Sequence, residues 1–278
     1  MRIVADSSAN LNSLPGTDFV SVPMLVRQGE REYRDTEKLR VDVMLRDMRQ
    51  RQEPTSTACP GVGEWLDAFG QEEEIFAAVL TSKLSGCYSA AHIAASEYMD
   101  AHPDRQVFVL DSLSTGPELE LLVERFAALY ADSGDFAAAC ESVRAYRRGT
   151  RLGFMLASLD NFARNGRVNP ALAKLVTMLH VHIVGRASAA GDLEPQNKCR
   201  GEKKALDQLW KNMLESGYAG GAVRLRHTEN DAAALSLRER ILGQYPDADV
   251  RIGENRGLCA YYAERGGMLV GYETEAAP

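Results

Sequence analysis

Short apolar runs alternate with stretches of helical spacing along the first half of the chain. Three of these runs have the length and composition of buried strands: Ile3–Ala5, Ile75–Leu80 and Gln106–Leu110. Each is followed by a polar turn, and Ile75–Leu80 and Gln106–Leu110 then lead into predicted helices. Strands that alternate with helices are typical of a largely parallel sheet flanked by helices. The first half of the chain is therefore predicted to form an α/β domain.

Other elements of this half follow from the same periods. Alternation of apolar and polar positions over Asp18–Val26 predicts a second strand, and Glu32–Asp35 predicts a short returning strand. Apolar residues at helical spacing predict a helix over Val41–Arg51. Two prolines and two glycines within Pro54–Trp65 predict a constrained loop. The apolar run Leu152–Leu156 predicts one more strand.

The second half is predicted to form a smaller α/β unit with a mixed sheet. Its expected strands are Val181–Arg186, Ala222–Leu225, Val250–Ile252 and Met268–Gly271. Its expected helices are Arg200–Ser216, Asp231–Gln244 and Asn255–Glu264. We therefore expect two domains, residues 1–157 and 158–278, with a ligand cleft between them.

Composition narrows the classes of function. A chain of 278 residues with 45% hydrophobic positions is long enough for two domains with buried cores. The net charge of -7, without a long basic run, argues against binding to nucleic acid or to an anionic membrane surface. The five cysteines form no CxxC pair, and no apolar run has membrane-spanning length. These features predict a cytoplasmic protein without stable membrane insertion.

The stretch from Leu80 to Ala91 joins a predicted strand to a predicted helix through a polar loop. Backbone N–H groups at the start of a helix have no acceptor within the helix, and the helix dipole makes that end partly positive. Ser85 offers a hydroxyl, and Gly86 allows a ligand to approach the backbone closely. The loop is therefore a candidate anion site. The simpler alternative is a serine that caps the helix, with glycine in the turn.

The loop Pro54–Trp65 is a second candidate anion site, because its Ser and Thr hydroxyls precede another predicted helix. A turn ended by proline and capped by a hydroxyl residue explains the same pattern.

An enzyme with a nucleophile in the first loop is the competing hypothesis. Cys87 stands where a helix N-terminus would lower the pKa of a thiol, and Ser85 is the other candidate nucleophile. No histidine lies in a recognisable catalytic motif. His180 and His182 share one face of a predicted strand, but two ligands make a poor metal site. The sequence contains neither GxGxxG after its first strand nor a GxxxxGK[ST] motif, so we expect no bound cofactor or metal.

A set of short motifs, taken in order, resembles the DegV family over nearly the whole chain. The motifs are Asp6-Ser7-Ser8-Ala9-Asn10-Leu11, Thr57-Ala58-Cys59-Pro60-Gly61, Leu84-Ser85-Gly86-Cys87-Tyr88, Asp111-Ser112, Asn165-Gly166-Arg167-Val168 and Lys198-Cys199-Arg200-Gly201-Glu202-Lys203-Lys204-Ala205. The resemblance implies two α/β domains that enclose a long-chain fatty acid. Some members act as the lipid-carrying subunit of a bacterial fatty acid kinase, whose ATP-binding subunit is a separate protein. The chain itself would then be non-catalytic.

The resemblance also implies which residues hold the carboxylate. The hydroxyls of Thr57 and Ser85, with the N–H groups around Gly86 and Cys87, correspond to the family's carboxylate site, which fits the need of a buried carboxylate for several donors. Arg200 matches the family's basic position after the second-domain hairpin, from which it could face the head group or the incoming phosphate, although a solvated cation at the start of a helix is an equal alternative.

The chain departs from the family pattern at several positions. The family usually has Thr where Cys87 stands, and Ser where Ala58 and Gly61 stand. Its C-terminal H-x-G-P-G segment corresponds here to Tyr261–Gly267, which contains no histidine. A tyrosine hydroxyl, such as that of Tyr262, can replace the hydrogen bond of the histidine but not its charge. Presentation of the lipid to a kinase is therefore left open by the sequence.

Overall fold

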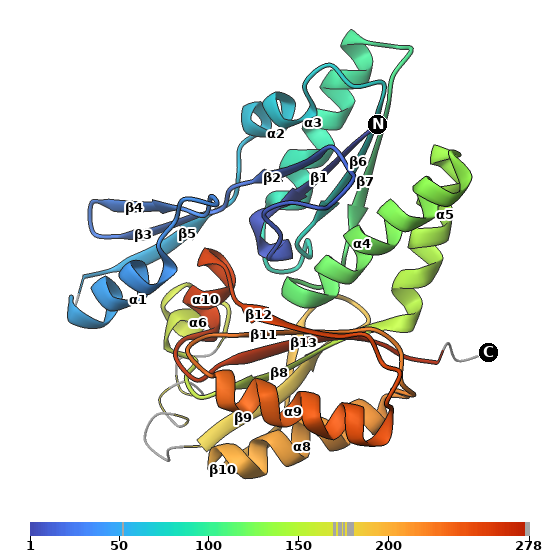
Figure 1. The fold of residues 1–278 in the computed structure, drawn as a ribbon. Coiled ribbons are helices and arrows are strands. Elements are labelled where there is room, and N and C mark those ends of the chain that lie inside the picture. The colour runs from blue at the N-terminus through green and yellow to red at the C-terminus, as the bar shows by residue number, and fades with distance from the viewer. Residues whose placement is uncertain (52, 169–170, 172–173, 175, 177–180, 276–278) are drawn as a thin grey trace.

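The computed structural model describes residues 1–51, 53–168, 171, 174, 176 and 181–275. Its first sheet has four parallel strands in the order β2-β1-β6-β7, which confirms the predicted parallel sheet (Figure 1). These strands are β1 (Arg2–Asp6), β2 (Phe19–Val22), β6 (Glu74–Val79) and β7 (Gln106–Asp111).

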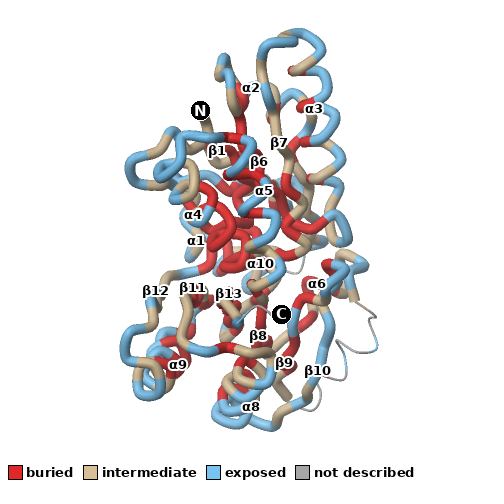
Figure 2. Tube along the Cα trace, turned by 90° about the vertical axis from the view of Figure 1, so that its right-hand side faces the viewer, coloured by how far each residue is buried: buried red, intermediate tan, exposed pale blue. Residues whose placement is uncertain are grey.

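Helices cover both faces of this sheet. Those on one face are α2 (Val62–Phe69) and α3 (Cys87–Ala101), and those on the other are α4 (Gly116–Ser133) and α5 (Phe136–Tyr146). Phe76 on β6 stacks on Phe126 of α4 with ring centroids 3.8 Å apart. The buried residues concentrate along the sheet and its helix contacts (Figure 2). All four strands therefore present their carboxyl ends at one edge, where α/β sheets bind ligands.

The second sheet is mixed and has the strand order β10-β9-β8-β13-β11-β12, which confirms the second unit. Its strands are β8 (Thr150–Leu156), β9 (Val181–Ala187), β10 (Leu193–Arg200), β11 (Val223–His227), β12 (Val250–Glu254) and β13 (Met268–Glu273). Only the pair of β11 and β12 is parallel among these described strands. Helices α8 (Glu202–Glu215) and α9 (Asp231–Gln244) cover its outer face, and α6 (Asp160–Arg164) and α10 (Gly257–Ala263) lie toward the first unit.

A small antiparallel sheet in the order β4-β3-β5 extends from the side of the first unit. It contains β3 (Leu25–Gln28), β4 (Arg31–Arg34) and β5 (Thr55–Ala58), and helix α1 (Val41–Gln50) accompanies it. Two predictions were wrong here. Asp18–Val26 forms two strands in different sheets, separated at Pro23, and the predicted loop Pro54–Trp65 contains β5.

Strand β8 belongs to the second sheet, because it pairs with β13 and β9. The predicted division at residue 157 would separate β8 from both partners. We therefore propose that the boundary between the two units lies before Thr150. Helix α4 belongs to the first unit but packs against β13 and β11 of the second sheet. A β-carbon on Gly271 would collide with the backbone of Pro117 and Glu118, so this close approach requires glycine.

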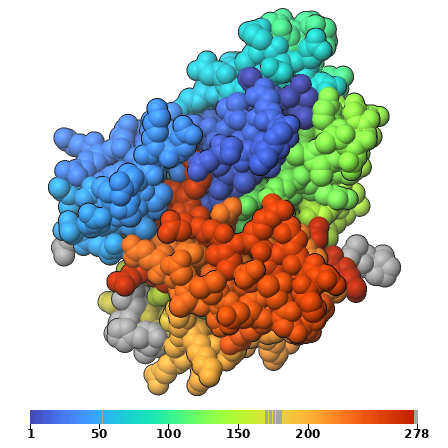
Figure 3. Space-filling model, in the orientation of Figure 1, coloured from blue at the N-terminus to red at the C-terminus, as the bar shows by residue number. Residues whose placement is uncertain are grey.

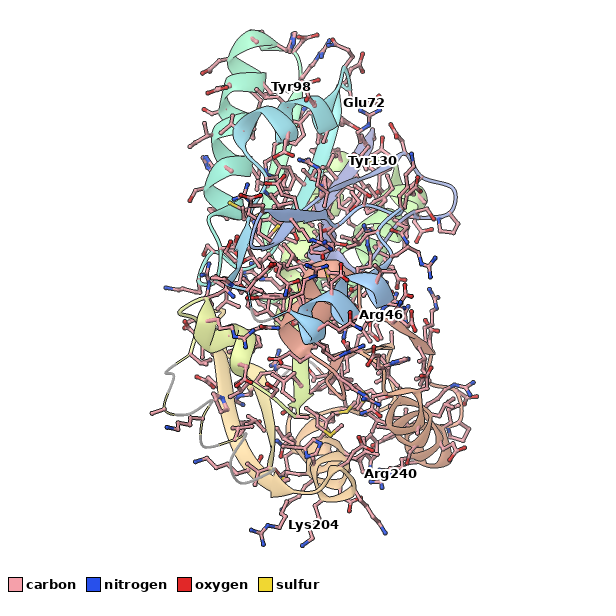
Figure 4. All side chains as sticks on the ribbon, turned by 90° about the vertical axis from the view of Figure 1, so that its left-hand side faces the viewer. Arg46, Glu72, Tyr98, Tyr130, Lys204 and Arg240 are labelled. Atoms are coloured by element: carbon pink, nitrogen blue, oxygen red, sulfur yellow. The ribbon has the colours of Figure 1, made fainter. Side chains whose placement is uncertain are left out.

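The two units form one continuous body (Figure 3). Ion pairs cross the contact between them: Arg226 on β11 pairs with Glu120 on α4, and Arg49 on α1 pairs with Glu229. Figure 4 labels residues at the outer ends of the molecule, with Tyr98 and Glu72 at one end and Lys204 and Arg240 at the other. The ends are thus far from the contact between the units, which contains the cavity described next.

Candidate functional site

A cavity of about 270 Å³ lies between the carboxyl edge of the parallel sheet and the inner face of the mixed sheet. Most of its wall is apolar and includes Leu152, Phe154, Leu156, Phe162, Leu258 and Leu269. The polar side chains of the wall include Thr57, Ser85, Thr115, Arg167 and Tyr262. An apolar cavity with a few convergent polar groups is the usual form of a small-molecule site.

Asp6, the last residue of β1, fixes the loop that follows β6. Its carboxylate accepts hydrogen bonds from the N–H groups of Leu80 at 2.6 Å and Ser8 at 2.9 Å. Burial raises the pKa of Asp6. Asp6 thereby connects the ends of two neighbouring strands and positions the segment that carries Ser85.

Ser85 and Gly86 both line the cavity immediately before α3. The Ser85 Oγ accepts a hydrogen bond from the N–H of Cys87 at 3.2 Å. Since that contact uses a lone pair of the oxygen, the hydroxyl proton remains available to a ligand. The adjoining helix N-terminus adds a partly positive potential. The structure therefore brings the predicted Ser85 and Gly86 to the cavity.

Thr57 lies on β5, and its hydroxyl is 2.9 Å from the hydroxyl of Tyr262 on α10. Each hydroxyl carries one proton, so their mutual bond uses one and leaves the other for a ligand. Burial raises the pKa of the Tyr262 phenol, which keeps its proton at neutral pH. The neighbouring pair, Thr55 and Tyr261, repeats this contact at 2.7 Å. Thr57 and Tyr262, both predicted from the sequence, thus lie together in the wall.

Cys87 is fully buried, and its Sγ lies 3.5 Å from Oδ2 of Asp6. Its thiol does not contribute to the cavity wall. Burial, with the Asp6 carboxyl beside it, raises the pKa of Cys87 well above that of an ordinary thiol. The expectation that a helix N-terminus lowers this pKa was wrong, because the thiol is desolvated and lies beside the Asp6 carboxyl. A buried, protonated thiol is a poor nucleophile.

Arg200 is exposed at the end of β10 and lies outside the cavity wall. The wall contains Arg167 instead, which follows α6 and whose Nε donates to the carbonyl of Leu84 at 3.4 Å. That contact holds the guanidinium against the loop of Ser85. Arg167 was not selected from the sequence, although it lies within the motif Asn165-Gly166-Arg167-Val168.

In the described part of the chain, no group of three or more His, Cys, Asp or Glu side chains could hold a metal ion. His182 is on β9, whereas His180 lies outside the described residues. Among the described helices, none combines the length and the apolar composition that crossing a membrane requires.

Comparison with known proteins places this architecture in one family. A family described as uncharacterised proteins, the DegV family, matches residues 1–275. A DegV domain-containing protein of Streptococcus pneumoniae is 37% identical over 278 residues, which are 99% of this chain and 99% of the relative. Another from Streptococcus pyogenes is 35% identical over 276 residues, covering 98% and 99% of the two chains.

Two solved structures are similar over almost the full chain. A DegV family protein of Eubacterium eligens, loaded with heptadecanoic acid, is 38% identical, with a TM-score of 0.95 and 99% of both chains covered. The Fatty Acid Kinase (Fak) B3 protein of Streptococcus pneumoniae, loaded with linoleic acid, is 37% identical, with a TM-score of 0.96 and the same coverage. The two-unit α/β fold and the resemblance found in the sequence motifs are both confirmed.

Proposed function

The chain belongs to the DegV family, and on that premise we propose that it binds one long-chain fatty acid in the cavity between its two sheets. Relatives loaded with heptadecanoic acid and with linoleic acid share 37–38% of their residues with it. The observation that carries the proposal is the cavity itself, which has an apolar wall and hydroxyl donors on the adjoining loops.

The carboxylate would lie between Ser85 and the pair formed by Thr57 and Tyr262. Each of these two places offers one O–H proton that no other contact uses. The N–H groups at Gly86 and the start of α3 support the same anion. Arg167 adds positive charge from the second unit. Because a carboxylate out of water is costly unless donors surround it, this convergence favours an acid over a neutral lipid.

The acyl tail would occupy the apolar part of the cavity. Leu152, Phe154 and Leu156 of β8 face it from the mixed sheet, and Leu258 and Leu269 come from α10 and β13. Burying a tail contributes about 0.8 kcal/mol per methylene. Affinity therefore needs no catalytic group, and the protein acts as a binding protein rather than as an enzyme with Cys87 or Ser85 as nucleophile.

A calorimetric titration of delipidated protein tests this proposal. A saturated long-chain acid, its methyl ester and the matching primary alcohol share the tail and differ in the head group. We expect the acid to bind most tightly, because only the carboxylate uses every donor of the site. Equal affinity for the three compounds, or no binding of any, would refute the assignment.

We further propose that the bound acid is presented to a separate ATP-binding kinase subunit, which forms the acyl phosphate. The similarity to the Fak B3 protein supports this, and so does the absence of a GxxxxGK[ST] motif from the sequence. Arg200, exposed at the end of β10, would contact the incoming phosphate or the partner rather than the buried carboxylate. The five free cysteines support a reducing, cytoplasmic location.

Trapping of the product tests the kinase proposal separately from lipid binding. Hydroxylamine converts an acyl phosphate into a hydroxamate that mass spectrometry detects. Lipid-loaded protein with ATP and a fatty acid kinase subunit should yield hydroxamate, and an Arg200→Ala variant should yield less while retaining its lipid. A loaded protein that yields none with an active kinase subunit would be a binding protein without this partner.

A further inference from the structure

We propose that Asp35 is a positioning residue of the carboxylate site, because it fixes the start of α10 and thereby the place of the Tyr262 hydroxyl. The inference rests on the proposed binding of a fatty acid and names a residue on which recognition of the head group depends. Asp35 lies in the segment between β4 and α1, outside the cavity wall. It therefore acts through α10 and not by contact with the ligand.

The carboxylate of Asp35 binds the first two N–H groups of α10. Its Oδ1 accepts the N–H of Gly257 at 2.9 Å, and its Oδ2 accepts the N–H of Leu258 at 2.9 Å. These groups have no acceptor within a helix, and a negative charge beside them also interacts favourably with the helix dipole. Arg256, the N-cap residue, supplies no side-chain cap of its own. The cap of α10 thus comes from a residue 222 positions away from Gly257.

Two further side chains fix the orientation of this carboxylate. The Ser7 hydroxyl donates to Oδ2 at 2.8 Å, and Nε of Arg256 lies 3.5 Å from Oδ1. The guanidinium of Arg256 also donates to the backbone carbonyl of Asp35 at 2.6 Å. Asp35 is only 1% exposed, and a buried carboxylate needs several donors. Because its partners come from both units, Asp35 holds α10 in a defined place against the first unit.

Gly257 allows α10 to come this close to Asp35. A β-carbon on Gly257 would lie 2.8 Å from Cγ of Asp35 and 2.6 Å from Cδ2 of Leu39. Contacts this short are repulsive, so a larger residue at this position would push the start of α10 away from the carboxylate. The close approach of the helix to Asp35 is therefore a specific feature of this sequence.

The start of α10 determines where Tyr262 lies. The helix has only seven residues, Gly257–Ala263, so a displacement of its first turn moves the whole element. Leu258, whose N–H binds Asp35, precedes Tyr262 by four positions, and its carbonyl is the helical acceptor of the Tyr262 N–H. The Tyr262 hydroxyl lies 2.9 Å from that of Thr57. A displacement of about 1 Å away from Thr57 would break this contact and separate the two hydroxyls of the carboxylate site.

The test measures how strongly each variant prefers a long-chain acid over the primary alcohol of equal chain length. Calorimetry on delipidated parent protein gives the reference ratio of the two affinities. Asp35→Asn should lower that ratio roughly three- to tenfold, because the acid makes more use of the Thr57 and Tyr262 hydroxyls than the alcohol does. In a Tyr262→Phe background, Asp35→Asn should lower the ratio no further, since the hydroxyl that Asp35 positions is already gone.

Glu120→Gln is the matched control for general destabilisation. Glu120 is also a buried carboxylate at the contact between the units, but it lies on α4 and pairs with Arg226 of β11. Its replacement should lower the unfolding midpoint and leave the ratio unchanged. Gly257→Ala keeps every charge and displaces the same helix start, so it should lower the ratio as Asp35→Asn does. It also carries the test if Asp35→Asn does not fold, which thermal unfolding establishes.

The possible results separate this inference from the proposed function. A ratio unchanged in folded Asp35→Asn or Gly257→Ala, an equal loss in Glu120→Gln, or additive losses with Tyr262→Phe would overturn it while leaving fatty acid binding intact. A parent protein that shows no preference for the acid over the alcohol would instead refute the proposed function.

Discussion

The hydroxyls of Thr57 and Tyr262 lie 2.9 Å apart, although 205 positions separate them in the chain. Thr57 belongs to the small antiparallel sheet, and Tyr262 belongs to a helix near the C-terminus. The contact between Thr55 and Tyr261 lies beside it and joins the same two elements. The proposed carboxylate site therefore exists only when α10 packs against β5, which links lipid binding to the assembly of both units.

Removal of the Tyr262 hydroxyl should weaken binding of a long-chain acid. In Tyr262→Phe the ring remains, but the Thr57 hydroxyl loses its hydrogen-bond partner and the site loses the hydroxyl proton of Tyr262. A net hydrogen bond contributes about 0.5–1.5 kcal/mol, so we expect roughly three- to tenfold lower affinity by calorimetry. Affinity equal to that of the parent would show that this pair does not contact the carboxylate.

Tyr261→Phe is the matched control. Tyr261 is fully buried, and its hydroxyl contacts Thr55 and Asn165 at 2.7 Å, outside the cavity wall. Leaving these groups without their partner should lower the free energy of unfolding by about 1–3 kcal/mol. Lipid affinity should change far less than in Tyr262→Phe.

Alkylation should distinguish the two cysteines near the carboxylate site. Cys59 lines the cavity and is partly exposed, whereas Cys87 is buried with a raised pKa. Iodoacetamide at neutral pH should modify Cys59 first, and bound fatty acid should slow that reaction. Peptide mass spectrometry measures both rates, with denatured protein as the control in which both react. Rapid modification of Cys87 in folded protein would revive the nucleophile hypothesis.

Replacing Glu118 should stabilise the protein at neutral pH. Burial raises the pKa of Glu118, so the folded state favours its neutral form. Its contribution to stability is present below its ordinary pKa of 4.5 and is lost as pH rises through the raised value. Glu118→Gln is neutral throughout and can still accept from Thr150, which donates at 2.8 Å.

We therefore expect a higher unfolding midpoint for Glu118→Gln than for the parent at neutral pH, with the difference shrinking toward pH 4.5. Glu239→Gln, at an exposed position of α9, should match the parent at both pH values. A destabilised Glu118→Gln at neutral pH would show that the carboxylate form is the one the fold stabilises.

The ion pair of Glu120 and Arg226 should be strongly coupled, because it joins α4 to β11 with little exposure. The Glu120 side chain is 2% exposed and that of Arg226 is 18% exposed, and Arg226 Nε donates to Glu120 at 2.8 Å. Glu120→Gln or Arg226→Met alone should lower the free energy of unfolding by about 3–5 kcal/mol. The double variant should recover part of this loss in urea unfolding. Additive losses would mean that the pair is not coupled.

The sequence predicted those strands and helices whose apolar and polar positions alone identify them. Buried strands such as β1, β6 and β7 are apolar runs that end in polar turns, so their type and common edge were predictable. β5, Thr55–Ala58, is polar and lies between prolines, and it becomes a strand because β3 supplies backbone partners from Leu25 to Gln28. β10 was missed for the same reason: its residues are mostly polar, and it pairs with β9.

The residues of the candidate site that the sequence predicted are those in which a short motif lies in a loop beside a predicted strand or helix. Ser85 and Gly86 lie in the loop between β6 and α3, and Thr57 lies in the predicted second loop, so local sequence order was sufficient to select them. The sequence analysis named Arg200 as the positively charged residue near the head group. The packing of the segment after α6 brings Arg167 to the cavity instead. The state of Cys87 was also beyond the sequence, since its burial beside Asp6 depends on contacts 81 positions apart.

Identification of the lipid in freshly purified protein tests the central claim most directly. The parent and a Thr57→Ala/Ser85→Ala variant, expressed alike in bacteria, are extracted with organic solvent under denaturing conditions, and the extract is quantified by mass spectrometry. The account predicts a long-chain fatty acid in about equal amount to the parent protein and a large loss from the folded variant. A parent that carries no fatty acid and takes up none when it is added would contradict the account.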